Sequence, residues 1–365
     1  MAITWITRLR AAATSLCRTV RHYQLLCAKE SFCIQRNFSV TAIQRSNPDD
    51  VAIVTKWRDS VLGRQAVLWD RMDSRQVTLL DQTIRPYLPC NYPSMPRNPK
   101  IGDVAQGTAM PPSAHLVYFP SHANELELSP DGYHADEAPP EPFSQRVWAG
   151  ARIEFNISNP LRVGEMASQT KSIESVQVKE RQNADPLVVV GLTLSIHNTN
   201  GLCVTEFRDL IYMKPVYLQR RVLKYNRAPD FCHEIIPTEV LMFRYSALSW
   251  NSHRIHYDSV YARNVEHHPG LLVHGPLTCT LLLQLLQANM PKGMTLKTFD
   301  YRALSPLYCQ QKLTLNGRWM KPLLDSADGS TDSGAKACEL WATNDEGGLA
   351  MKGVATIVPV APNGQ

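Results

Sequence analysis

The chain has 365 residues, 44% of them hydrophobic and 19% charged, a composition typical of a globular protein with one large or two medium-sized domains. A membrane-spanning helix needs roughly 18 uninterrupted apolar residues. The longest apolar stretch, residues 271–286, is broken by His274 and Pro276, so no membrane span is predicted.

The net charge of +5 lies entirely in the N-terminal segment. Residues 1–38 hold six Lys and Arg residues against one acid, which leaves residues 39–365 neutral and predicts no nucleic-acid surface. An Arg-bearing, acid-poor N-terminus is typical of a mitochondrial transit peptide, and residues 36–39 resemble a matrix-peptidase site. We therefore expect residues 1–38 to be a transit peptide and the mature protein to lie in the mitochondrial matrix. A disordered basic tail is the alternative.

Cysteine spacing and short motifs exclude several classes of protein. The six cysteines after residue 38 contain no CxxC pair, which argues against a disulfide framework or a zinc ribbon. Motifs for dinucleotides, for nucleoside triphosphates and for a hydrolase nucleophile elbow are absent from the sequence, and no cofactor is predicted. His253 and His256 have the spacing of half a metal site, but no third ligand follows at a characteristic distance, so no metal is predicted either.

The first 140 residues predict few regular elements. Apolar residues interspersed with charges indicate helix over residues 50–85. Residues 86–142 hold twelve of the 25 prolines, a density that predicts a loop-rich surface region with a short helix near Ala114–Phe119.

From residue 148 onward, apolar and polar residues alternate along the chain, which indicates antiparallel strands. An apolar run over residues 275–289 predicts one buried helix between two groups of strands. The strands are expected at residues 148–157, 167–178, 187–198 and 203–213, and then at 296–303, 312–318, 336–343 and 350–359.

An internal repeat joins these elements. Residues 155–160 recur as 301–306, an offset of 146, and the Asn/Gly turn at 198–202 recurs at 344–349. Two matched copies indicate a duplicated domain. A long helix and a curved antiparallel sheet, repeated, predict an α+β double hotdog fold with the two central helices side by side. We expect an N-terminal unit at residues 50–220 and a C-terminal unit at 225–365. Two unrelated α+β domains are the alternative.

The densest polar cluster lies just before the predicted helix 275–289. His256 has a side chain that can accept or donate a proton near neutral pH, and Asn251 can hold a water molecule but cannot take its proton. Gly275 and Pro276 suit a helix start, with Gly275 expected as the N-cap, and such a start offers free backbone N–H groups to a carbonyl oxygen. His267 and His268, next to Pro269, are expected to be loop residues. A structural role is the alternative for each histidine.

The segment from Leu248 to His256 resembles the hydratase motif of the MaoC-like, R-specific enoyl-thioester hydratases, and Leu271–Gly275 resembles the Val-His-Gly turn of that family. Residues 148–155, 160–164 and 206–212 are similar to the companion domain of its two-domain branch. The resemblance implies a hydro-lyase with His256 and Asn251 as catalytic residues and with Gly275 and His274 at the thioester. It implies supporting roles for His253 and Ser249.

Three positions depart from the family pattern: Asn251 stands in place of Asp, His253 in place of Asn, and Trp250 in place of Gly. Asn251 moves the acid/base work onto His256. Subtracting 146 from His256 and Gly275 gives Met110 and Ser129, so the first unit is expected to have lost the motif and to shape the acyl pocket.

The implied reaction is reversible dehydration of a 3-hydroxyacyl thioester to a trans-2-enoyl thioester in mitochondrial fatty-acid synthesis. Hydration of mesaconyl-C4-CoA or itaconyl-CoA, and a non-catalytic acyl-binding or scaffold role, remain alternatives. A hotdog thioesterase is disfavoured by the spacing of Asn251 and His256. The sequence does not choose between CoA and acyl carrier protein as the thiol carrier. A homodimer is one oligomeric state that the fold would allow.

Overall fold

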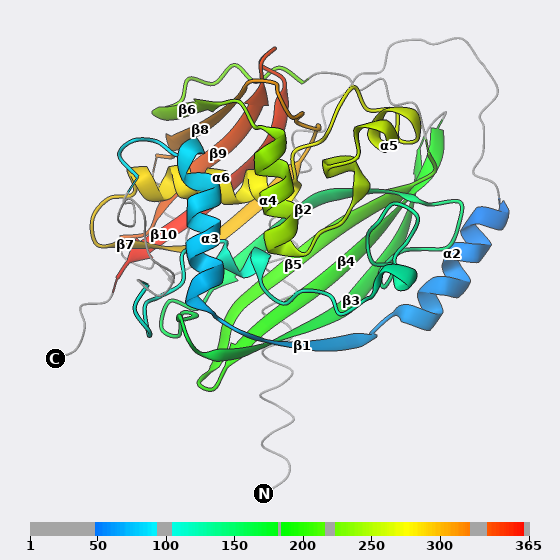
Figure 1. Cartoon of the computed structure of the whole chain (residues 1–365), viewed down its shortest axis with the longest axis horizontal. Helices are drawn as coiled ribbons and strands as arrows, with labels where there is room; N and C mark the ends of the chain where they lie inside the picture. The colour runs from blue at the N-terminus through cyan, green and yellow to red at the C-terminus, as the bar shows by residue number, and fades with distance from the viewer. Residues whose placement is uncertain (1–47, 93–103, 182–183, 216–222, 322–333, 361–365) are drawn as a thin grey trace, which may run out of the picture. The chain divides into compact units, whose positions relative to one another are not determined.

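A computed structural model describes residues 48–92, 104–181, 184–215, 223–321 and 334–360 (Figure 1). Its centre is a ten-stranded antiparallel sheet with the order β1-β3-β4-β5-β2-β7-β10-β9-β8-β6. The expected transit peptide lies outside the described residues. Within the described parts of the chain, no helix combines the length and the apolar character needed to cross a membrane.

The first half of the sheet consists of five strands with two α-helices beside its first strand. The strands are β1 (Gln65–Arg71), β2 (Gln145–Phe155), β3 (Met166–Arg181), β4 (Ala184–Asn198) and β5 (Gly201–Met213), and the helices are α2 (Pro48–Val61) and α3 (Ser74–Ile84). The connection from α3 to β2 contains three short 3-10 helices, η1 (Arg85–Tyr87), η2 (Ala114–Val117) and η3 (Glu125–Glu127).

The second half has the same strand plan but more helix. Its strands are β6 (Phe231–Ile235), β7 (Met294–Ala303), β8 (Leu313–Trp319), β9 (Lys336–Asn344) and β10 (Leu349–Pro359). Between β6 and β7 come α4 (Glu239–Ser249), the 3-10 helix η4 (Arg254–His256), α5 (Ser259–Asn264) and α6 (Gly275–Asn289).

The two halves are related by an approximate two-fold axis through the middle of the sheet. Each half orders its own strands first, third, fourth, fifth, second, and the halves join where β2 pairs with β7. Ile153 and Phe299 are direct partners in that pairing and are also separated by the repeat offset of 146. Both side chains are fully buried, so the centre of the duplication lies in the core.

Helix α6 is apolar on all sides and is buried along residues 277–286, as expected for a helix enclosed by a sheet. It shares one core with α3 and α4, which pack against each other (Figure 1). A second core lies between α2 and strands β3, β4 and β5. The helices in direct contact across the two halves are thus α3 and α4 rather than two long central helices.

Most predicted elements are confirmed. All eight strands, the helix at 275–289 and the short helix near Ala114 are present. The continuous helix over 50–85 is wrong, because β1 interrupts it: Val67, Leu68 and Trp69 favour a strand and pair with β3. Strand β6 and helix α4 were not predicted, since their apolar residues lie in a segment that the sequence marks mainly by its polar cluster.

Candidate active site

A cavity of about 160 Å³ opens at the N-terminus of α6, where the two halves meet. The second half contributes the segment after α4, the start of α6 and the end of β7. The first half contributes Tyr133, residues 145–148 of β2 and Leu210 of β5. Four of the predicted site residues line this cavity: Asn251, His253, His256 and Gly275. The structure therefore brings together residues that the sequence separates by more than twenty positions.

Asn251 lies in a tight turn that ends α4. Trp250 adopts a left-handed backbone with φ of 52°, and the Asn251 N–H donates to the carbonyl of Ser246 at 2.9 Å. The side-chain oxygen of Asn251 accepts the His253 N–H at 3.0 Å. Its amide nitrogen has no hydrogen bond to another described residue, so it remains able to hold a water molecule or a substrate oxygen.

His256 ends the 3-10 turn η4 and is largely buried. Its Nδ1 lies 2.9 Å from the carbonyl oxygen of Leu272. A carbonyl can only accept, so Nδ1 carries the proton and Nε2 is the basic nitrogen. The pKa of His256 is lowered to about 3, first by burial and then by the neighbouring His253. The imidazole is therefore neutral at physiological pH and able to accept a proton.

His274 lies beneath His256 rather than at the cavity wall. The two rings stack with centroids 3.7 Å apart and an interplanar angle of 21°. His274 is fully buried, and its Nε2 lies 2.8 Å from the Ser246 hydroxyl. Burial, followed by the nearby His256, lowers its pKa well below the usual value. The geometry gives His274 a supporting position, because its side chain is directed at the protein core.

Gly275 is the first residue of α6, and His274, not Gly275 as expected, is the N-cap. The first N–H groups of a helix have no intrahelical acceptor, so the Gly275 N–H is available to a ligand. A Cβ on Gly275 would lie 3.2 Å from Trp148 of β2, so an alanine here would require Trp148 to shift by a few tenths of an ångström. Trp148 itself is held by a hydrogen bond to Tyr301 at 2.9 Å and by Arg208 over its ring.

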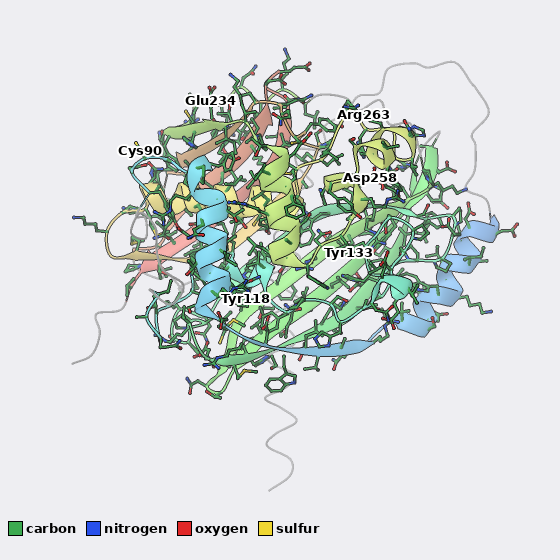
Figure 2. All side chains as sticks on the ribbon, viewed as in Figure 1. Cys90, Tyr118, Tyr133, Glu234, Asp258 and Arg263 are labelled. Atoms are coloured by element: carbon green, nitrogen blue, oxygen red, sulfur yellow. The ribbon has the colours of Figure 1, made fainter. Side chains whose placement is uncertain are left out.

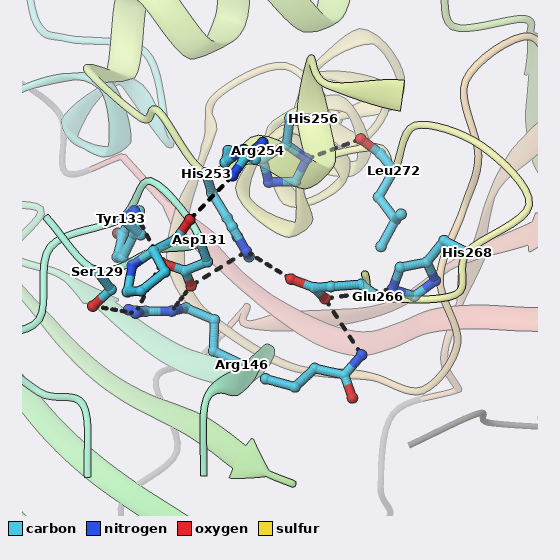
Figure 3. Close-up of polar contacts among 12 residues, drawn as sticks. Ser129, Asp131, Tyr133, Arg146, His253, Arg254, His256, Glu266, His268 and Leu272 are labelled. Atoms are coloured by element: carbon cyan, nitrogen blue, oxygen red, sulfur yellow. Dashed lines mark hydrogen bonds and ion pairs between the residues drawn. The ribbon is translucent and has the colours of Figure 1, made fainter. Parts of the chain in front are cut away.

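His253 is held between two buried carboxylates. Its Nε2 lies 3.5 Å from Asp131 of the first half and 3.5 Å from Glu266, as Figure 3 shows. Asp131 also binds Arg146, and its carbonyl oxygen accepts the Arg254 N–H at 2.8 Å. The loop around Asp131 thereby fixes the segment that carries His256.

Ser249, the remaining predicted supporting residue, does not line the cavity. Its hydroxyl donates to the carbonyl of Tyr245 at 2.7 Å, one turn back in α4. The hydroxyl thus bonds to a backbone carbonyl within the last turns of α4, which is a common role of a serine at such a position.

Sequence reasoning missed several cavity residues. Glu266 and His268 follow α5 and line the cavity, while His267 is exposed on the same loop. Gln145 and Arg146 reach it from the first half, and Arg146 packs over Tyr133 at 4.9 Å. In the sequence, the acidic residue directly before two histidines could have indicated Glu266 as a candidate site residue. The first-half residues carry no comparable signal, because only the β2–β7 pairing brings them to the site.

One further group has the geometry of metal ligands. His134, Asp136 and Glu137 offer ligand atoms within 4.8 Å of one another. The Lys171 ammonium already binds Glu137 and lies 3.6 Å from Asp136, and His134 Nδ1 lies 3.1 Å from Glu137. We therefore interpret this cluster as an ion-pair network beneath the first half of the sheet.

Comparisons with known proteins agree with this architecture. A family model described as hydroxyacyl-thioester dehydratase type 2 matches residues 113–309, which span both halves. Mesaconyl-C(4)-CoA hydratase of Chloroflexus aurantiacus is 34% identical over 58% of this chain and 75% of that protein. The mitochondrial hydroxyacyl-thioester dehydratase type 2 of Schizosaccharomyces pombe is 26% identical over 70% of this chain and 90% of that protein.

Solved structures show the same fold at low identity. A MaoC-like dehydratase from Phytophthora capsici matches with a TM-score of 0.56 and 14% identity, over 84% of this chain and 99% of that one. A Mycobacterium tuberculosis protein described as having a double hotdog fold matches with a TM-score of 0.52 and 11% identity, over 83% and 97%. The predicted double hotdog fold is confirmed.

Proposed function

The chain belongs to the hydroxyacyl-thioester dehydratase type 2 family, and we propose that its cavity catalyses the reversible addition of water to the Cα–Cβ double bond of an acyl thioester. The observation that carries this proposal is the convergence of three groups on one cavity: the neutral imidazole of His256, the side-chain amide of Asn251 and the free N–H of Gly275.

In the hydration direction, Asn251 holds a water molecule and His256 Nε2 takes one of its protons. The water oxygen bonds to Cβ, and the π electrons move toward the thioester carbonyl. The Gly275 N–H, at the positive end of α6, stabilises the negative charge on that oxygen. Protonation of Cα by the His256 imidazolium completes the addition, and dehydration reverses these steps.

The leading substrate is a 3-hydroxyacyl thioester of mitochondrial fatty-acid synthesis. The match with the Schizosaccharomyces pombe protein over 90% of that protein favours it. The second candidate is a mesaconyl-type CoA thioester, which the higher identity to the Chloroflexus protein favours. Both substrates undergo the same chemistry at Cα and Cβ, so the proposed roles of His256, Asn251 and Gly275 do not depend on the choice.

A mitochondrial location, in the matrix, is part of the proposal. The basic, acid-poor residues 1–38 support it, and so do two relatives whose names place them in mitochondria. N-terminal sequencing of the protein isolated from mitochondria is expected to begin after Phe38 or a few residues later. A mature protein that begins at Met1 would contradict this location.

The decisive assay incubates the purified chain separately with crotonyl-CoA, mesaconyl-CoA and a 3-hydroxyacyl carrier protein. Absorbance of the enoyl thioester is expected to fall with the first two and to rise with the third if each is a substrate. Turnover of any one of them, lost in His256→Ala, is the expected result. Binding without turnover of all three would favour the scaffold alternative.

A further inference from the structure

Glu266 is a buried charge at the reaction cavity that the mechanism above does not use. Adding water to a double bond converts a neutral imidazole into an imidazolium while the proton is in transit. His256 is buried, and its nearest ring neighbours are His274, stacked at 3.7 Å, and His253 at 5.5 Å. Neither imidazole can compensate a positive charge. A carboxylate can, and Asn251 does not supply one.

Among the described residues that line the cavity, Glu266 is the single carboxylate. Its side chain is 6% exposed, and three side chains from three segments point toward it (Figure 3). His253 Nε2 lies 3.5 Å from one oxygen, and Gln145 of β2 lies 3.3 Å from the other. His268 Nε2 lies 3.8 Å from that second oxygen.

These surroundings keep Glu266 ionised. Burial by itself raises the pKa of this carboxyl, but the neighbouring His253 and His268 hold it well below the usual range. The charge of Glu266 in turn raises the pKa of His256, against the larger effect of burial. The buried phenol of Tyr261 faces the same carboxylate from α5.

We propose that Glu266 is a positioning residue of the hydration reaction: it orients His253 and His268 along the cavity wall and stabilises the imidazolium that forms on His256. The inference rests on the proposed function. No bond to Glu266 forms or breaks. The proton moves from water to His256 Nε2 and then to Cα, and Glu266 remains a carboxylate throughout.

The test compares Glu266→Gln, which keeps the shape and removes the charge, with Glu266→Asp, which keeps the charge. The control is Glu234→Gln on edge strand β6, an exposed acid far from the cavity residue Tyr133 in Figure 2. Hydration of crotonyl-CoA is followed with the full chain, and kcat, KM and melting temperature are measured for each variant.

Glu266→Gln is expected to lower kcat by roughly 100-fold, because the imidazolium on His256 loses the charge that stabilises it, and to change KM by less than about threefold. Glu266→Asp should retain more activity than Glu266→Gln. The double variant Asn251→Asp/Glu266→Gln returns a carboxylate to the cavity and should regain at least about tenfold over Glu266→Gln. A Glu266→Gln kcat within threefold of wild type, or Glu266→Asp no better than Glu266→Gln, overturns the inference.

A measurement on the unaltered protein covers the case in which Glu266→Gln does not fold. Nitrogen NMR of histidine-labelled protein should find the His253 proton on Nε2, toward Glu266. A proton on Nδ1 alone would overturn the inference. The proposed function fails separately, if the wild-type chain turns over none of the three thioesters. If wild type is active, His256→Ala is inactive and Glu266→Gln is active, only the role of Glu266 is lost.

Discussion

The two halves of the sheet share one strand plan, yet the groups proposed for water addition all lie in the second half. Backbone pairing shows which residues correspond. In the second half the Val273 N–H donates to the carbonyl of Leu307 at 2.8 Å, and in the first half the Met110 N–H donates to the carbonyl of Leu161 at 2.8 Å. The residues at Leu161 and Leu307 are 146 positions apart, as in the repeat.

This match assigns Pro111 to His274 and Pro112 to Gly275, an offset of 163. The fixed offset of 146 had assigned Ser129 to Gly275, which is wrong because the first half has seventeen more residues between this point and β2. Proline has no N–H, so the first half cannot stabilise charge on a thioester oxygen at this position. Among the described residues, the N–H proposed to bind the thioester oxygen is therefore present at this position in the second half and absent from the first.

The additional first-half residues have a different use. In place of a long helix, the first half has the single turn η2 at residues 114–117, and the chain continues as a loop to the second half. There the Gly132 carbonyl accepts the Ser252 hydroxyl at 2.5 Å, and Asp131 holds Arg146 and His253. Residues of the first half therefore position the segment that carries the proposed catalytic residues of the second half.

The largest expected effect comes from His256→Ala, which removes the basic nitrogen from the second half and leaves it as inert as the first. Turnover should fall by about 10²–10⁴-fold, because that is the usual contribution of one acid/base group. His267→Ala, on the exposed part of the same region, is the matched control and should change turnover less than about tenfold. Steady-state hydration of one enoyl thioester measures both. Equal rates for the two variants would place the site elsewhere.

Gly275→Pro converts the helix start of the second half into that of the first. It should lower kcat by about 10²–10³-fold, the usual effect of losing one oxyanion donor. Gly275→Ala is the control, because its Cβ meets Trp148 at the same 3.2 Å while the N–H is kept. The ratio of the two kcat values isolates the N–H. A ratio near one would exclude Gly275 as the donor.

Asn251 should contribute less than His256, because it orients water without taking a proton. We expect Asn251→Ala to lower kcat by roughly 10–100-fold, in line with one lost hydrogen bond to an attacking water. Asn251→Asp keeps an oxygen for the His253 N–H and should retain measurable turnover. Kinetics and melting temperatures of both variants test this. An Asn251→Ala variant with full activity would remove Asn251 from the mechanism.

The buried pair His256 and His274 also predicts a pH dependence of stability. The pKa of His256 falls from 6.5 to about 3 on folding, so below pH 6.5 the unfolded state binds more protons than the folded state. The free energy of unfolding should therefore decrease as the pH is lowered from 6.5 to 4.5. For this residue the decrease approaches about 1.4 kcal/mol per pH unit. His274 acts in the same direction.

Urea unfolding of wild type and His256→Gln at several pH values measures this dependence. The variant lacks the His256 imidazole, so its free energy of unfolding should change less per pH unit between pH 6.5 and 4.5. Identical slopes would mean that His256 is already protonated in the folded protein.

The sequence by itself determined the local elements and indicated the groups that we propose to react. Eight strands, helix α6 and the duplication follow from side-chain alternation and spacing, because these patterns record which face of an element is buried. The segment from Asn251 to His256 and the turn at Gly275 stood out by their polar residues, by the helix-start signal and by resemblance to the hydratase motif. Local patterns contain that information because the residues concerned are close together in the chain.

The tertiary structure alone decided the contacts between distant segments. Strand β1 becomes a strand through its pairing with β3, and Gln145, Arg146 and Trp148 reach the cavity of the second half only because β2 pairs with β7. His274 changes from an expected thioester contact to a buried support for His256, since its ring is directed at Ser246. Such roles depend on packing between segments that are separate in the sequence, where side-chain periodicity holds no information on which surfaces meet.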